Sequence, residues 1–160
     1  MSYTFNHDEM LEELCYSLYD PCTGIFHPGA WMASTKKFKP YKQDLDKAEA
    51  LLDESGWVDS NNDGIRDKEI DGRTVPFEFS ILVNQQPLRI AICTLLKENL
   101  DQIGIRLNVR PVESTVLQDL TLNRKFQAYL GGWGSGTDPD TSENLWKTGA
   151  MRNFCNYSNP

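Results

Sequence analysis

Residues 127–140, QAYLGGWGSGTDPD, hold the clearest structural signal in the chain. Residues 128–130 have the bulk of a short β-strand. Glycines then crowd around one large aromatic residue, Trp133, and residues 138–140 form a turn or helix-start signal. A strand that opens into a glycine-rich loop is typical of the ligand-binding edge of an α/β sheet, where ligands collect beyond the carboxyl ends of the strands.

Two interpretations of this loop remain open at the level of sequence. In the first, the backbone at Gly132, Gly134 and Gly136 approaches a ligand, because glycine has no side chain to keep the ligand away. Trp133 then offers a large, rigid contact surface, and Asp138 accepts a hydrogen bond from the ligand. In the second interpretation, Trp133 caps the core and the glycines only form a turn.

The residues before this loop predict alternating strands and helices. Val75 begins a partly alternating, then apolar run that is expected to end as a buried strand. Gly104 is expected to end a helix that Pro87 begins, and Ser114 is expected to cap a second helix. The expected order is a strand at 75–84, a helix at 87–103, a strand at 105–112, a helix at 114–123 and the strand from 127. We therefore predict an α/β fold with a right-handed βαβαβ unit whose helices cover the sheet.

The first half of the chain predicts two helices. The apolar spacing in residues 7–18 favours one helix, with its buried face formed by Met10, Leu11, Leu14 and Leu18. Residues 44–55 favour another, with Asp44 as N-cap and Gly56 as a left-handed end.

A polar segment after the second helix resembles the start of a calcium-binding loop. Asp59, Asn61 and Asp63 are followed by Gly64, as in the pattern D-x-N-x-D-G. The position where a bidentate Glu belongs is Ile70, so the motif is half complete. The alternatives are a calcium-stabilised structural domain and a solvated polar turn that enters a hairpin.

The composition limits the class of partner. A length of 160 residues suits a single domain, and a net charge of −7 argues against nucleic acid, whose phosphates require clustered cations. No apolar run is long enough to span a bilayer, and residue 1 leads directly into polar sequence. The expectation is a cytoplasmic protein, or one whose targeting segment has been removed. The four cysteines form no CxxC pair; a Cys15–Cys22 disulfide stays open, and Cys93 is expected to be a buried thiol.

Enzyme signatures fail on inspection. The dinucleotide pattern would require a third glycine where Thr137 stands. A nucleophile elbow would require glycines two residues to either side of Ser135, where Trp133 and Thr137 stand. An acid pair near Asp138 would need a converging His, Lys or second acid, and the spacing offers none. We therefore expect no catalytic residues and no cofactor apart from a structural calcium ion.

Several stretches together resemble the C-terminal lobe of bacterial extracellular solute-binding proteins of family 5, which serve peptide and nickel ABC importers. The stretches that carry the resemblance are PCTGIFHPGAW, DLDKAEALLDESGW, DSNNDGIRD, LLKENLDQIGIRLNVRPVE and FQAYLGGWGSGTDPD. The resemblance runs from about residue 6 to residue 160.

The resemblance implies a type II periplasmic-binding fold, with residues 1–160 as a single domain that forms most of one lobe of a larger two-lobe protein. It further implies a monomer in the periplasm, or a cell-surface lipoprotein, that delivers a solute such as a peptide to a membrane permease. Trp133 then lines the ligand cleft. Peptide binders of the family have an Asp three residues after this Trp, where this chain has Gly136, so an oligosaccharide or another small solute is the alternative ligand.

Overall fold

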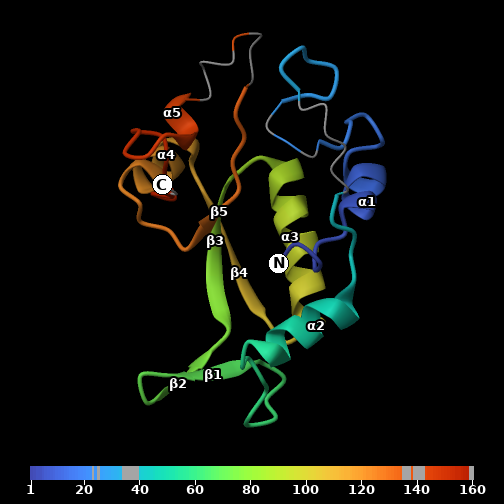
Figure 1. Ribbon diagram of the computed structural model, residues 1–160, viewed down its shortest axis with the longest axis vertical. Coiled ribbons are helices and arrows are strands. Elements are labelled where there is room, and N and C mark those ends of the chain that lie inside the picture. Colours follow the sequence, from blue (N-terminus) through green and yellow to red (C-terminus); the bar gives the residue numbers. More distant parts are fainter. Residues whose placement is uncertain (23, 25, 34–39, 135–137, 139–142, 159–160) are drawn as a thin grey trace.

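The computed structural model describes residues 1–22, 24, 26–33, 40–134, 138 and 143–158. Its centre is a three-stranded parallel sheet in the order β4-β3-β5, formed by β4 (Arg106–Val112), β3 (Glu78–Asn84) and β5 (Ala128–Tyr129). The crossovers are α3 (Pro87–Asp101) and α4 (Ser114–Leu122). Figure 1 shows α3 on one side of the sheet and α4 on the other. The predicted βαβαβ unit and α/β class are confirmed.

The core lies between the sheet and α3. Leu82 and Val83 of the central strand are 2% and 0% exposed. Leu100 of α3 and Leu107 of β4 are fully buried in the same cluster as Val83. Gly104 ends the predicted helix with φ +74°, and a Cβ there would lie 3.2 Å from the Gly64 carbonyl oxygen. This turn therefore requires glycine both for its backbone angle and for its close approach to the neighbouring loop.

Helix α2 (Leu45–Glu54) lies where the sequence predicts it. The Asp44 carboxylate accepts a hydrogen bond from the Lys47 amide at 3.0 Å, which confirms the predicted N-cap. Gly56 follows the helix with φ +83°. Ala48 of this helix is buried, whereas Leu51 is 46% exposed.

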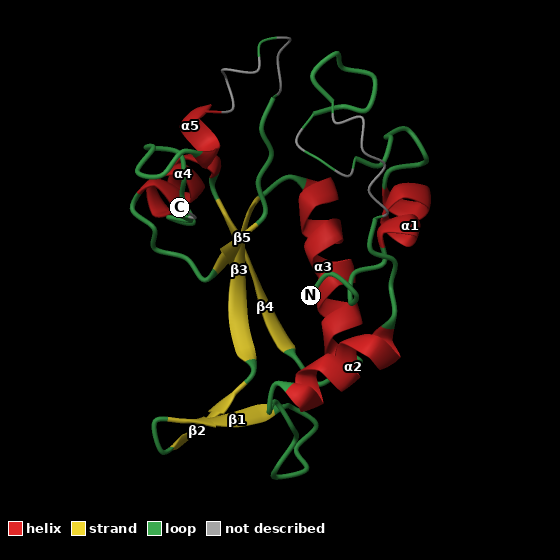
Figure 2. Cartoon of the chain, in the orientation of Figure 1, coloured by secondary structure: helices red, strands yellow, loops and turns green. Residues whose placement is uncertain are grey.

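The strand predicted at 75–84 is wrong in its extent. Residues 73–76 form β2 (Arg73–Pro76), which pairs antiparallel with β1 (Asp67–Ile70) in a separate two-stranded sheet. The break falls at Phe77, whose amide donates to the Arg66 carbonyl and whose carbonyl accepts from the Arg106 amide. The chain therefore changes partner from the hairpin to the main sheet at this residue. Figure 2 shows the β1–β2 hairpin below the main sheet, at the lower end of β3.

The helix predicted at 7–18 is also shorter than expected. It consists of α1 (His7–Glu9) and a π-helical turn, η1 (Met10–Leu14). Tyr16 and Ser17 have φ of 52° and 54°, which turns the backbone out of the helix, and Leu18 is 79% exposed. The last helix, α5 (Glu143–Trp146), is a single turn.

Smaller corrections concern α4 and the cysteines. Glu113, with no side-chain cap, precedes α4, so Ser114 is its first residue and not its N-cap. Val116 and Leu122 of this helix are exposed. The cysteines are all free, which leaves no Cys15–Cys22 disulfide, and burial raises the pKa of the Cys93 thiol to about 11. No described helix has the length and apolar character needed to cross a membrane.

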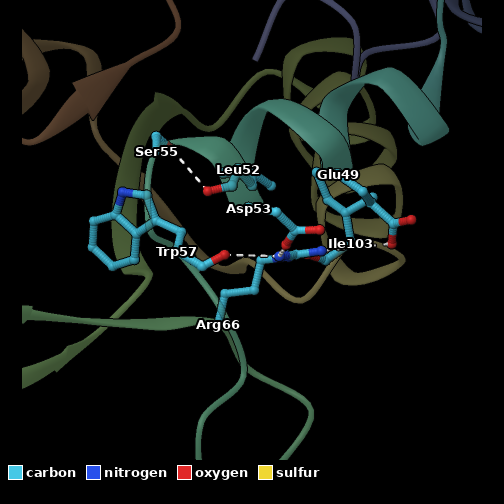
Figure 3. A network of polar contacts seen from close by, with 7 residues as sticks. All are labelled: Glu49, Leu52, Asp53, Ser55, Trp57, Arg66 and Ile103. Atoms are coloured by element: carbon cyan, nitrogen blue, oxygen red, sulfur yellow. Dashed lines mark hydrogen bonds and ion pairs between the residues drawn. The ribbon is translucent and has the colours of Figure 1, made fainter.

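One arginine joins three segments at the hairpin end of the molecule (Figure 3). The Arg66 side chain is 13% exposed. Its Nε donates to the Ile103 carbonyl and its Nη1 to the Trp57 carbonyl, both at 2.8 Å. Its guanidinium also pairs with Asp53 of α2 and lies 3.9 Å from Glu49. Arg66 thus holds the hairpin, the end of α2 and the α3–β4 turn together.

We predict that Arg66→Met lowers the free energy of unfolding by about 2 kcal/mol or more, because two partly buried carbonyls and a carboxylate lose a charged donor. Arg73→Met, on the exposed face of β2, is the matched control and should change it by less than about 0.5 kcal/mol. Urea denaturation of both variants measures the difference. Equal stability of the two variants would contradict a joining role for Arg66.

Candidate ligand-binding site

The strand order places a crevice at one edge of the main sheet. From β3 the chain crosses through α3 to β4 on one side, and then through α4 to β5 on the other side. The order therefore reverses between β3 and β5, and such a reversal leaves a crevice beyond the carboxyl ends of the two strands. In Figure 1 these ends point upward, away from the β1–β2 hairpin.

A groove of about 1390 Å³ lies at this position. One wall is formed by the end of β5 and the start of α3, and the opposite wall by the N-terminal segment. The sheet-side wall contains Leu130, Gly131, Gly132, Gln86, Leu88 and Arg89. The polypeptide backbone of the predicted glycine loop therefore borders an open space, as the first interpretation of that loop requires.

The charged side chains of the groove differ in their pairing. Lys42 Nζ lies 2.7 Å from the Asp8 carboxylate, and this hydrogen bond raises the pKa of Lys42. Asp20 has His27 Nε2 at 3.6 Å. Arg89, in the first turn of α3, makes no ion pair with any residue that the structure describes. The groove thus contains one half-buried cation whose charge is not neutralised within this part of the chain.

Trp133 projects from the glycine loop with 47% of its surface exposed. Its ring centroid lies 5.7 Å from that of Phe154, and the Arg152 guanidinium lies 5.4 Å from the indole centroid. Burial raises the pKa of Tyr129, and the neighbouring Trp133 indole opposes this rise. The C-terminal segment thus covers part of Trp133 and leaves the rest open. Trp133 lies beside the groove and is not part of its lining.

Gly131 is held to glycine by a close contact. A Cβ at this position would lie 2.7 Å from Cε2 of Tyr129. The Tyr129 ring has little room to move, because Phe126 and Phe154 lie 5.0 and 6.0 Å away between ring centroids. By contrast, a Cβ at Gly134 would meet no atom within 4 Å.

The structure describes three of the four other residues that the sequence predicts to contact a ligand. Gly132 and Gly134 are exposed, and Asp138 is exposed and takes part in an interaction within the protein. Gly136 lies outside the described residues. The sequence analysis missed Arg89, although Pro87 at the start of a helix that follows a buried strand is a signal that points to this edge of the sheet.

The calcium-like segment forms a polar turn before the hairpin. Asp59 accepts hydrogen bonds from the Asp63 and Gly64 amides at 3.1 and 3.0 Å, and Asp63 accepts one from the Ile65 amide at 2.8 Å. Asn61 also accepts from the Asp63 amide, at 2.9 Å. The described residues contain no group of three or more His, Cys, Asp or Glu side chains that could hold a metal ion. Calcium binding by Asp59, Asn61 and Asp63 stays a prediction.

Comparison with known sequences gives one family. The model of the bacterial extracellular solute-binding proteins, family 5 (middle region) matches residues 1–154. The oligopeptide-binding protein AppA of Bacillus subtilis is 35% identical over 114 residues, which cover 69% of this chain and 20% of AppA. The nickel-binding periplasmic protein of Escherichia coli is 23% identical over 140 residues, which cover 87% of this chain and 26% of that protein. The chain thus spans about a quarter of the length of these relatives.

Solved structures agree with this result. Bacillus subtilis AppA in complex with a nonapeptide matches with a TM-score of 0.88 at 25% identity, over 99% of this chain and 32% of AppA. NikZ of Campylobacter jejuni in complex with Ni(L-His) matches with a TM-score of 0.80 at 28% identity, over 99% and 32% of the two chains. These neighbours confirm the expected type II periplasmic-binding fold.

We predict that Gly131→Ala destabilises the protein by about 1–3 kcal/mol, because the new methyl group has to displace the packed Tyr129 ring. Gly134→Ala is the matched control and should change stability by less than about 0.5 kcal/mol, because its Cβ enters open space. Thermal unfolding followed by circular dichroism measures both variants. If Gly131→Ala unfolds at the wild-type temperature, Tyr129 does not hold the glycine loop in place.

Proposed function

Because the chain belongs to family 5 of the bacterial extracellular solute-binding proteins, we propose that it forms most of one lobe of a two-lobe receptor. This receptor captures an oligopeptide-like solute for an ABC importer and catalyses no reaction. The observation that carries the proposal is the groove at the reversed edge of the sheet, bordered by the backbone of Gly131 and Gly132.

The size and form of the groove favour an extended solute. Its volume of about 1390 Å³ exceeds the roughly 300–1,000 Å³ of sites for small molecules. The groove is partly open to solvent, so we propose that this lobe supplies only part of the contact surface. A second lobe that closes over the solute completes the site and excludes water. Bound alone to this lobe, the solute is held weakly.

In this proposal Trp133 contacts the solute with the part of its indole that Phe154 and Arg152 leave open. The contacts with Phe154 and Arg152 restrain the ring, so little conformational entropy is lost when a solute packs against it. The backbone of Gly132 and Gly134 lets the solute come close, and Asp138 accepts a hydrogen bond from it. Gly136 belongs to the same proposed set.

The proposed partner is the membrane permease of an ABC importer, and the proposed location is the periplasm or, as a lipoprotein, the cell surface. The names of the two relatives, an oligopeptide-binding protein and a nickel-binding periplasmic protein, support this part of the proposal. We propose that the receptor is a monomer.

An oligosaccharide is the second candidate solute. Gly136 stands where a peptide binder of this kind would have an acidic partner for the peptide amino group, and an exposed indole also suits the flat face of a sugar ring. A mannohexaose-bound protein of Thermotoga maritima shares the fold with a TM-score of 0.79 at 19% identity, which is evidence for the fold alone.

We predict that Trp133→Ala in the full-length protein weakens solute binding about tenfold to a hundredfold, because a rigid aromatic contact is lost. Trp133→Phe is the matched control, since it keeps an aromatic face, and should stay within about threefold of the wild type. Isothermal titration calorimetry with a nonapeptide pool and with mannohexaose measures the affinities and tells the two solute classes apart. An unchanged affinity of Trp133→Ala for every bound solute would remove Trp133 from the site.

A further inference from the structure

We propose that Arg89 anchors a carboxylate group of the solute at the sheet edge of the groove. This inference rests on the proposed function, because it assigns one chemical group of the solute to one residue of the same site. It concerns a residue outside the glycine loop that the sequence analysis singled out.

Arg89 lies where a solute in the groove would contact it. Arg89 lies in the first turn of α3, directly beyond the carboxyl end of β3, and it lines the groove. Its Nη2 atom lies 3.6 Å from the point where a Cβ of Gly132 would stand. The guanidinium therefore lies beside a stretch of backbone, Gly131 and Gly132, that has no side chains to separate it from a solute. A solute that rests against Gly132 meets Arg89 at contact distance.

The charge of Arg89 has no counter-ion among the described residues of the groove. Asp8 of the groove is paired with Lys42 at 2.7 Å, and Asp20 has His27 nearby at 3.6 Å. Within the described part of the chain, no carboxylate lies within ion-pair distance of Arg89, although the protein carries 23 acidic residues against 16 basic ones. A half-buried guanidinium without a counter-charge is unusual in so acidic a chain, because burying an unpaired charge costs free energy. An anionic group of the solute supplies the missing partner.

The guanidinium of Arg89 matches a carboxylate in both charge and geometry. A guanidinium donates two parallel hydrogen bonds to a carboxylate, a geometry that a lysine does not reproduce. The first turn of α3 contains no acidic residue, and Gln86 makes no side-chain cap, so the positive end of this 15-residue helix adds to the charge of Arg89. Both sources of positive charge lie on the sheet-side wall of the groove, where Gln86 and Leu88 also line it.

A carboxylate reaches this position either as the free C-terminus of a peptide or as part of a small organic acid. The test uses two pools of random nonapeptides that differ only in their C-terminus, which is free in one pool and amidated in the other, together with citrate as a small polycarboxylate. Each probe is incubated with the full-length protein, and bound molecules are counted by native mass spectrometry and titrated by calorimetry.

We predict that the wild type binds free-acid nonapeptides about tenfold to a hundredfold more tightly than amidated ones, the range expected for a charge-assisted hydrogen bond. Arg89→Met, which keeps the aliphatic stem, should lower the affinity for free-acid peptides to that of the amidated pool and leave the amidated pool unchanged. Arg89→Lys should recover only part of the preference. If Arg89→Met weakens the binding of citrate and not that of the peptides, the carboxylate comes from a small acid.

The matched control is Arg73→Met, which removes an exposed arginine from the hairpin at the opposite end of the molecule (Figure 1). It should keep the wild-type preference and thereby exclude an effect of net charge alone. Equal binding of free and amidated peptides by the wild type would overturn the anchoring role of Arg89 and leave the receptor function standing. If the protein binds mannohexaose but neither peptides nor citrate, both the anchoring role of Arg89 and the peptide-like solute are overturned.

Discussion

The pairing of β3 with a parallel strand on each side is the constraint on which the rest of the structure depends. Because β4 and β5 lie on opposite sides of β3, the two crossover helices start in different directions and the sheet is covered on both faces. The same arrangement leaves no connection across the carboxyl ends of β3 and β5. The crevice at this edge is thus a consequence of strand order, and the groove lies there for that reason.

The two ends of the main sheet differ in how their arginine side chains are paired. At the amino end, Arg66 uses its whole guanidinium within the protein and joins the hairpin to α2 and to the α3–β4 turn. At the carboxyl end, Arg89 is half buried and has no counter-ion among the described residues, and Gly132 beside it keeps the backbone open. The first arginine joins parts of the protein, and the second is the residue that we propose to contact the solute. In the receptor that we propose, the first end forms a rigid base and the second forms the binding edge.

Prediction from sequence was accurate where the signal was local. Asp44, Gly56 and Gly104 mark helix ends through their own capping or backbone properties, and the structure confirms all three. It failed where partners far along the chain decide. Residues 75–84 read as one extended run, but Val75 pairs with the hairpin and the strand after Phe77 pairs with β4. Leu18 fits the helical period, yet the positive φ angles at Tyr16 and Ser17 turn it into solvent.

The sequence by itself determined the α/β alternation, the family resemblance and the glycine loop with its single indole, because each of these follows from residue type and spacing along the chain. Only the tertiary structure decided what lies around that loop. Tyr129, Arg152 and Phe154 lie next to Trp133, and Arg89 of helix α3 lies next to Gly132. These contacts join residues far apart in the chain, and their pairing depends on strand order and packing, which no local pattern encodes.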